Sequence, residues 1–399
     1  MPTTPMKNNL YRLGLILFAP SVATQQVLFR YREDETLPLS PDYGPGRLFK
    51  RHHMLGGTLL LDDGKQWTQT CSSLKTAPKR VVTPATVFRA ASITKMVTAA
   101  CVLRLAEKGL LRLEDRIFDR LPTALPAEHP LRAATVEQVL CHRSGLRDTP
   151  AYEAAFARGD TYDAILADAS ASWGTPGGDF AYCNLGFGLL GSLIETVTGE
   201  CLEAVYQREV FVPLEMNATL DVTQADKEHT LPISRVLPYR AKRAWQVEAA
   251  AEKARPLAQP DPLHHFGYAA GSLYTDAASL DHFLTMLVQH GEYQGQCYLS
   301  SASIDAMTTA HASYGSIAPT LAYGLGLLLI NDPALSPRRI LGHQGFAYGC
   351  VNGAFYEEGT GRRVILLNGG ASEARMGRLG RINRDILRWA LREDNDAWT

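Results

Sequence analysis

Two stretches of the sequence place a serine three residues before a lysine, a spacing that can support acyl-transfer chemistry. They are Ser92-Ile93-Thr94-Lys95 and Ser72-Ser73-Leu74-Lys75. On a helix, residues three apart share a face, so a lysine amine can exchange a proton with the serine hydroxyl. A serine hydroxyl is a weak nucleophile that needs such a base close by. The spacing therefore indicates nucleophilic catalysis if it lies on a helix.

Only the copy that begins at Ser92 lies in a helical pattern. Apolar residues crowd within 91–108 as in a buried helix, and Gly109 suits the end of that helix. A serine at a helix start lies near unpaired N–H groups and the positive end of the dipole. The lysine must be neutral to accept a proton, which desolvation among apolar neighbours favours. The copy at Ser72 is followed by Pro78, which cannot continue a helix, and we interpret it as a decoy in a strand or loop.

A second group of candidates, Tyr182-Cys183-Asn184, follows a turn at Thr175–Asp179. A tyrosine beside a lysine ammonium can relay protons, and an asparagine amide can orient both the lysine and a substrate carbonyl. A structural alternative exists for both motifs. Ser92 could be a helix cap with a surface lysine after it, and Tyr182 could be a buried tyrosine before a capping asparagine.

The third group is His343-Gln344-Gly345, within the strand-like stretch 339–346. A glycine in a strand beside an active site allows the substrate backbone to approach closely. The N–H group of Phe346 could then form an oxyanion hole with that of Ser92. A competing His265-Phe266-Gly267 lies in a less strand-like context.

Taken together and in this order, the S-x-x-K, Y-x-N and H-x-G motifs resemble the serine β-lactamase and penicillin-binding protein superfamily. The likeness is strongest to its branch of class C β-lactamases, DD-carboxypeptidases and esterases. The stretches around the motifs that share it are 88–95, 140–146, 213–216 and 270–273. The likeness spans residues 54–370, so the combination is far more specific than any single motif.

The resemblance implies an α/β (α+β) fold in two lobes, an antiparallel sheet flanked by helices with an all-helical lobe inserted. It implies that Ser92 is the nucleophile at the head of the central helix, and that Lys95 and Tyr182 share general base and acid work. Asn184 would hold the substrate, and His343 and Gly345 would line the sheet side of the cleft. The substrate class implied is a small molecule, a short peptide or an ester.

Two positions depart from the family's pattern. His343 stands where β-lactamases of this branch usually carry lysine, and a neutral imidazole clamps a carboxylate less firmly than an ammonium. This favours a D-amino-acid peptidase, a carboxypeptidase or a carboxylesterase over a class C-type β-lactamase, which stays open as an alternative. The middle residue of Y-x-N is Cys183, where a smaller residue is common, and a thiol beside the site can be oxidised.

Two rival interpretations come from other classes. The stretch 186–191 matches G-x-G-x-x-G, which would indicate a dinucleotide-binding oxidoreductase, but it lacks a parallel βαβ setting. The other rival is a non-catalytic ligand-binding member of the same fold, because a fold alone does not guarantee activity.

The order of patterns predicts one sheet built from both ends of the chain. A hairpin is expected over 54–72 around Asp63-Gly64, and strands over 321–330, 339–342, 350–356 and 363–367. A helical lobe is expected at about 110–265, and Leu379, Ile382, Ile386 and Trp389 form the apolar stripe of a final helix. We therefore expect an N-terminal segment, residues 1–53, which is either a signal or an extra element and is irregular over 24–53, and one domain, residues 54–399.

Composition sets outer limits on function. The 399 residues carry a net charge of −1, which argues against a nucleic-acid-binding surface. The seven cysteines are odd in number and form no C-x-x-C pair, and neither His52-His53 nor His264-His265 has metal-ligand spacing. We predict no metal and no organic cofactor, and leave the oligomeric state open.

Cellular location depends on two opposing signals. We interpret the cysteines as reduced residues of the core, which favours a cytoplasmic protein. The alternative is secretion or export to the periplasm, since Lys7 and Arg12 precede a short apolar run at 13–19, and Ser21-Val22-Ala23 resembles a cleavage site. No apolar stretch is long enough to span a membrane.

Overall fold

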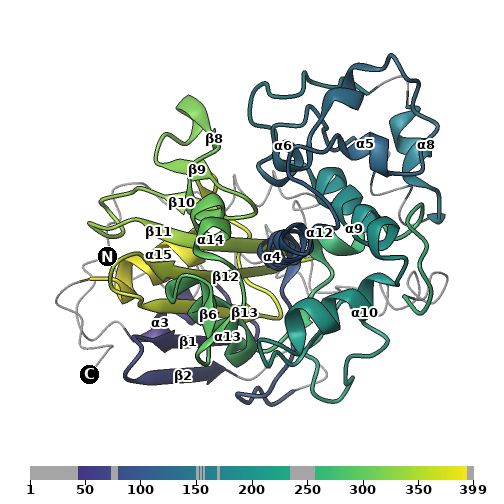
Figure 1. Cartoon of the computed structure of the whole chain (residues 1–399). Coiled ribbons are helices and arrows are strands. Elements are labelled where there is room, and N and C mark those ends of the chain that lie inside the picture. The colour runs from purple at the N-terminus through teal and green to yellow at the C-terminus, as the bar shows by residue number, and fades with distance from the viewer. Residues whose placement is uncertain are drawn as a thin grey trace, which may run out of the picture.

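The computed structural model describes residues 44–72, 80–149, 159–168, 171–233 and 257–392, together with Tyr152, Ala155 and Arg158. The possible export signal and Lys75 lie outside the described residues. The described residues form an eight-stranded antiparallel sheet with helices on both faces and, beside it, a region of helices (Figure 1). The fold class predicted from the sequence, an antiparallel sheet combined with helices, is confirmed.

The main sheet has the strand order β2-β1-β13-β12-β11-β10-β9-β8. Its strands are β1 (Gly57–Asp62), β2 (Trp67–Ser72), β8 (Ala312–Ser313), β9 (Leu321–Tyr323), β10 (Leu328–Ile330), β11 (Ile340–Ala347), β12 (Cys350–Glu357) and β13 (Arg363–Asn368). The hairpin β1–β2 pairs with β13 near the other end of the chain, where Gly57 lies opposite Asn368. The strands β1, β12 and β13 are buried along nearly their whole length, because helices cover the sheet on both faces.

One face of the sheet is covered by α3 (Pro45–Arg51) and α15 (Arg381–Ala390), which lie together in Figure 1. Ile382, Ile386 and Trp389 are buried in the core on this face, so the predicted apolar stripe does pack on the sheet. The expectation of an irregular segment up to residue 53 is wrong for α3. A proline in its first turn suits a helix start, and Leu48 and Phe49 fill the same core.

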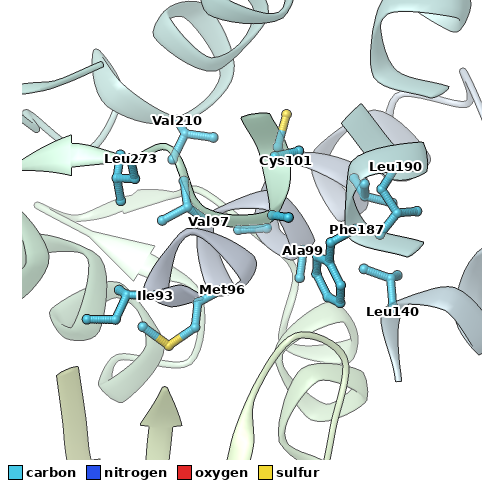
Figure 2. Packing of buried hydrophobic residues seen from close by; sticks show 14 of the residues in the cluster. Ile93, Met96, Val97, Ala99, Cys101, Leu140, Phe187, Leu190, Val210 and Leu273 are labelled. Atoms are coloured by element: carbon cyan, nitrogen blue, oxygen red, sulfur yellow. The ribbon is translucent and has the colours of Figure 1, made fainter. Parts of the chain in front are cut away.

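The opposite face of the sheet packs against α13 (Ala277–Val288) and leads into the helical region through α4 (Thr94–Glu107). Figure 2 shows how α4 is surrounded: Phe187, Leu190, Leu140 and Val210 close on it from neighbouring helices. A helix that is apolar on all sides belongs in the interior, and α4 is buried through almost all of its length.

The helices within the predicted lobe are α5 (Ile117–Arg120), η2 (Pro130–Ala133), α6 (Val136–Leu140), α8 (Tyr162–Leu166), α9 (Asn184–Thr198), α10 (Leu202–Tyr206) and the π-helical η3 (Gln207–Phe211). The remaining elements are β3 (Phe88–Arg89), η1 (Ala91–Ile93), β4 (Ala218–Thr219), α12 (Tyr268–Gly271), β5 (Tyr274–Thr275), β6 (Glu292–Tyr293), β7 (Gln296–Cys297), α14 (Ser301–Thr308), η4 (Gly315–Ile317), β14 (Arg375–Met376) and β15 (Leu379–Gly380).

The stretch 321–330, predicted as one strand, is two strands joined by a turn. Gly326 has a φ of +75°, and its N–H group donates to the carbonyl of Leu140. A Cβ atom at Gly326 would lie 2.8 Å from the carbonyl oxygen of Lys95. The chain turns back here because the tip of the β9–β10 hairpin packs against α4.

The G-x-G-x-x-G stretch lies on α9, which follows a loop and not a strand. A Cβ atom at Gly188 would lie only 1.6 Å from the carbonyl oxygen of Phe266, so this glycine allows close packing between α9 and the chain before α12. The dinucleotide-binding interpretation thus loses its structural basis. No single described helix meets the length and apolarity of a membrane span, while α9 and the following Leu202–Phe211, bent by 86°, meet them only as a pair.

Candidate active site

Ser92 is held at the head of α4 by a strained turn. The residue before it, Ala91, has a φ of +53°, a conformation uncommon for a residue with a Cβ atom. The carbonyl oxygen of Ala91 accepts a hydrogen bond from Thr94 Oγ1 at 2.6 Å, and Thr94 Oγ1 accepts one from the Leu273 N–H group at 3.1 Å. Strain of this kind persists only where the surroundings fix it, and it gathers at functional sites.

Gly345 of β11 packs directly against this turn. A Cβ atom at Gly345 would lie 2.1 Å from the carbonyl oxygen of Ala90 and 3.1 Å from Cβ of Ala91. The glycine therefore lets the sheet approach the chain beside Ser92, which the sequence argument had assigned to the approach of the substrate. The oxyanion hole between the N–H groups of Ser92 and Phe346 stays a prediction.

Lys95 lies beneath Ser92 and is fully buried. Its Nζ atom is 3.2 Å from Ser92 Oγ, 2.8 Å from Asn184 Oδ1 and 2.7 Å from the carbonyl oxygen of Ala270. Burial lowers the pKa of Lys95 to about 7, against a smaller opposing effect of the Asp148 carboxylate. Close to neutral pH, a large fraction of this amine is therefore the free base.

Tyr182 stands on the other side of the nucleophile. Its side chain is hydrogen-bonded to that of Ser92, and its ring centroid lies 4.9 Å from Lys95 Nζ. Burial raises the pKa of Tyr182 above its usual range, against the effect of the Ser92 bond. The phenol is therefore protonated in the resting site and can donate or relay a proton, but it does not act as a phenolate base.

His142 supports the segment that carries Tyr182. Its Nδ1 atom accepts the N–H group of Cys183 at 3.2 Å, its carbonyl accepts that of Ala181 at 2.9 Å, and its ring packs 4.5 Å from the Tyr182 ring. The pKa of His142 lies well below its ordinary value, first because of burial and then because of Lys95 and His343. His142 lies within the family-like stretch 140–146, and the sequence alone indicates no role for it.

Asn184 is the first residue of α9, and its partner Asp148 was missed by the sequence analysis. The Asp148 carboxylate accepts from the N–H groups of Asn184 and Leu185 at 2.7 and 3.0 Å, and from Asn184 Nδ2 at 2.7 Å. Asp148 comes 36 residues before Asn184 in a stretch that reads only as a loop, so no local pattern pairs them. Its position two residues after the family-like stretch 140–146 was the one available signal.

Cys183 lies between Tyr182 and Asn184 in the sequence, and its side chain is buried. Its Sγ atom accepts the Gly186 N–H group at 3.4 Å and is 3.4 Å from Asp148 Oδ1. Burial, followed by the Asp148 charge, raises the pKa of Cys183 well above its ordinary value. A thiol without thiolate character is a poor target for oxidants. All seven cysteines of the chain are free.

His343 is also buried, and both of its ring nitrogens have partners within the protein. Nδ1 is 2.6 Å from the carbonyl oxygen of Gln344, to which it must donate, so Nε2 accepts from Tyr323 Oη at 2.9 Å. Burial, and then the Lys95 charge, lowers the pKa of His343 to about 3. The ring borders the cleft, but its one N–H group, on Nδ1, is held by the Gln344 carbonyl, so a substrate carboxylate could accept from it only by displacing that carbonyl.

The competing histidine motif lies elsewhere. His265 Nδ1 is 2.8 Å from Glu195 Oε1 on α9, and both side chains are buried. This pair links α9 to the chain before α12 and does not border the cavity above Ser92. Among the described residues, no three histidine, cysteine or acidic side chains are grouped so as to hold a metal ion.

A cavity of about 600 Å³ opens over Ser92. Its walls come from the helical region and from the sheet, and include Tyr182, Asn184, His343, Phe346, Asp148, Phe180, Tyr314, Ile317, Arg147, Arg375 and Arg378. The Arg375 guanidinium lies 4.1 Å from the centroid of the Phe346 ring. The three sequence motifs therefore meet at one cleft, and the rim adds aromatic and cationic side chains that the sequence analysis did not single out.

Comparison with known proteins gives a consistent result. The β-lactamase family model matches residues 46–387. Penicillin-binding protein 4 of Amycolatopsis lactamdurans is 29% identical over 178 residues, which are 43% of this chain, and the chain spans 46% of the length of that relative. Esterase EstB of Burkholderia gladioli is 28% identical over 337 residues, covering 76% of this chain and 82% of the esterase.

Among solved structures, the D-amino acid amidase from Ochrobactrum anthropi SV3 superposes with a TM-score of 0.63 at 21% identity, over 84% of this chain and 94% of the amidase. This likeness concerns the fold. The family match extends over most of the chain, through the helix of Ser92 and the sheet that faces it. The chain belongs to the β-lactamase family.

Proposed function

We propose that the protein hydrolyses carboxylic esters and D-amino-acid amides or short D-peptides through an acyl-enzyme on Ser92. The observation that carries this proposal is the buried amine of Lys95, 3.2 Å from Ser92 Oγ with its pKa lowered to about 7. An amine that is partly free base next to a hydroxyl is the arrangement that activates a serine.

The contacts of Lys95 also direct its lone pair. Asn184 Oδ1 and the carbonyl oxygen of Ala270 can only accept hydrogen bonds, so each accepts one from the two N–H groups of the neutral amine. The lone pair is then left for Ser92 Oγ. In the protonated form, the same position carries the proton that Ser92 has given up.

The chemistry follows in two steps. Ser92 Oγ bonds to the substrate carbonyl carbon while its proton passes to Lys95. The bond to the leaving oxygen or nitrogen then breaks, and that atom takes a proton through Tyr182, whose hydroxyl is bonded to Ser92. Water then bonds to the acyl carbon while its proton passes to Lys95. The bond between that carbon and Ser92 Oγ breaks, Oγ takes the proton back, and the acid is released.

The surroundings of His343 support an ester or amide substrate over a β-lactam. A β-lactam antibiotic presents a carboxylate beside the reacting carbonyl, and the ring at this position is neutral with both nitrogens occupied. The similarity to proteins named esterase and D-amino acid amidase also supports an ester or amide substrate. An anionic group of the substrate could still bind farther from Ser92, at three arginines on the rim of the cavity: Arg147, Arg375 and Arg378.

The test is a substrate panel assayed with the full chain: p-nitrophenyl acetate, p-nitrophenyl hemisuccinate, D-phenylalanine amide, a D-Ala-D-Ala peptide and nitrocefin. We expect ester or D-amide turnover to exceed nitrocefin turnover in kcat/KM, and a fluorophosphonate to label Ser92. Faster nitrocefin turnover would make a class C-type β-lactamase the better assignment. Absence of both labelling and turnover would favour a non-catalytic ligand-binding protein.

A further inference from the structure

Asp148 borders the cavity, and the mechanism above gives it no role. Its Oδ1 atom accepts from the N–H groups of Asn184 and Leu185, the first two of α9, which is the work of a helix cap. Its Oδ2 atom is used differently, because it accepts from the Asn184 side chain, Nδ2, at 2.7 Å. The helix cap does not require this second contact.

The Oδ2 contact decides which way the Asn184 amide faces. A carboxylate oxygen can only accept, so the end of the amide beside it must be the NH₂ group. Oδ1 of Asn184 is thereby turned towards Lys95, where it takes one N–H bond at 2.8 Å. If the amide were turned over, its NH₂ group would face Lys95 and compete with Ser92 for the lone pair.

We propose that Asp148 is a positioning residue for acyl transfer, which fixes the Asn184 amide and so aims the lone pair of Lys95 at Ser92. The inference rests on the function proposed above. Asp148 also acts through its charge, since it favours the protonated form of Lys95. The other titratable or charged groups that interact with Lys95 are Cys183, Arg89, Tyr182, His142 and His343.

The decisive variant is Asp148→Asn, which keeps the size of the side chain and a carbonyl oxygen for the two backbone N–H groups. The new NH₂ group then faces Asn184 Nδ2, and Asn184 must turn its amide over to accept from it. We expect the plateau of kcat/KM for p-nitrophenyl acetate to fall about ten-fold to a hundred-fold, part of what a general base contributes. The acid limb of the pH profile should move to lower pH. The pKa of Lys95 falls because the negative charge of Asp148 is gone and Asn184 no longer turns an acceptor towards the amine.

Asp276→Asn is a matched control. Asp276 caps α13 by accepting the Ser279 N–H group at 2.8 Å, and its other oxygen accepts from Asn217 Nδ2 at 3.1 Å. It makes the same kinds of contact outside the cavity. This substitution should lower Tm while the position of the acid limb stays unchanged.

A second variant keeps the test open if the single substitution harms folding. Combining Asp148→Asn with Asn184→Asp exchanges the two groups, so that a carboxylate oxygen faces Lys95 and the new amide donates to its partner oxygen. We expect this pair to recover part of the plateau lost in Asp148→Asn and to move the acid limb above that of the wild type, because the negative charge now contacts the amine.

The pKa of Lys95 can also be followed without substrate, by NMR of carbon-13-labelled lysine in the full chain. It should fall in Asp148→Asn and rise in the exchanged pair. An unchanged lysine titration and plateau in Asp148→Asn would overturn the inference, as would a loss that follows Tm alone as in Asp276→Asn. Absence of Ser92-dependent hydrolysis in the wild type would instead reject the proposed function, and the lysine titration would still decide the role of Asp148.

Discussion

The two serine–lysine pairs have the same spacing in the sequence, and their serines lie in opposite surroundings. Ser92 heads the buried helix α4 after a strained turn, whereas Ser72 ends the edge strand β2, opposite Gly57. On a helix, this spacing places serine and lysine on one face. Half of the β2 residues are exposed, including Trp67, which is 58% exposed, and the rest are partly buried.

The environment of Lys95, more than the motif, makes this lysine a base. Lys95 is enclosed by α4, α9 and α12, and its pKa is lowered to about 7. A lysine in water has a pKa of about 10.4, so burial raises the share of free base at neutral pH by roughly a thousand-fold. The four predictions that follow test this contrast, from the largest expected effect to the smallest.

Ser92→Ala should abolish hydrolysis while the protein stays folded. Removing the nucleophile typically costs on the order of 10³ to 10⁶ in kcat. Steady-state kinetics on the best substrate of the panel, together with a thermal unfolding curve, will measure both parts. Full activity in this variant would mean that the active serine lies elsewhere.

Lys95→Ala and Tyr182→Phe should each lose most of the rate, on the order of 10² to 10⁴. The double variant should lose little more, because members of one proton relay are strongly non-additive. A double-mutant cycle in kcat measures the coupling. Losses that simply add would indicate that the two side chains do separate work.

The pH dependence should show the buried amine directly. Lys95 acts as a base only when neutral, so activity should rise with pH through the lowered pKa of about 7 and then level off. Below that midpoint, kcat/KM should fall about ten-fold per pH unit, as expected for one proton. A profile that is flat between pH 5 and 9 would contradict the role of Lys95.

Ser72→Ala should leave activity and stability almost unchanged. The Ser72 side chain lies on an edge strand, and surface substitutions of this kind are usually within about 0.5 kcal/mol. This variant is the control for Ser92→Ala, since it removes a hydroxyl from the same four-residue pattern. A loss of activity here would require the contrast between the two pairs to be abandoned.

Much of the fold could be predicted because its signals are local. The turn at Asp63-Gly64, the buried helix that ends before Gly109 and the stripe on α15 each depend on neighbours a few residues away. The break between β9 and β10 could not be predicted, because the hairpin bends to meet α4 and not to satisfy its own sequence. The helix α3 was missed because proline and glycine at its start also suit an irregular segment.

The site divides in the same way. Ser92, Lys95, Tyr182 and Asn184 have motif spacings, and the structure brings them together. Other contacts of the site join Asp148 to Asn184, Tyr323 to His343 and Ala270 to Lys95, across 20 to 175 residues of sequence. Such contacts exist only once the chain has folded, so periodicity and spacing do not reveal them.

The pairing of β1 with β13 has a consequence for the synthesis of the protein. Gly57 and Asn368 lie side by side in the sheet although roughly 300 residues separate them. At translation rates of about 5–20 residues per second, β1 leaves the ribosome about 15–60 s before its partner exists. During that time, an apolar strand, Leu59-Leu60-Leu61, has one side of its backbone unpaired. The native sheet can therefore close only near the end of synthesis.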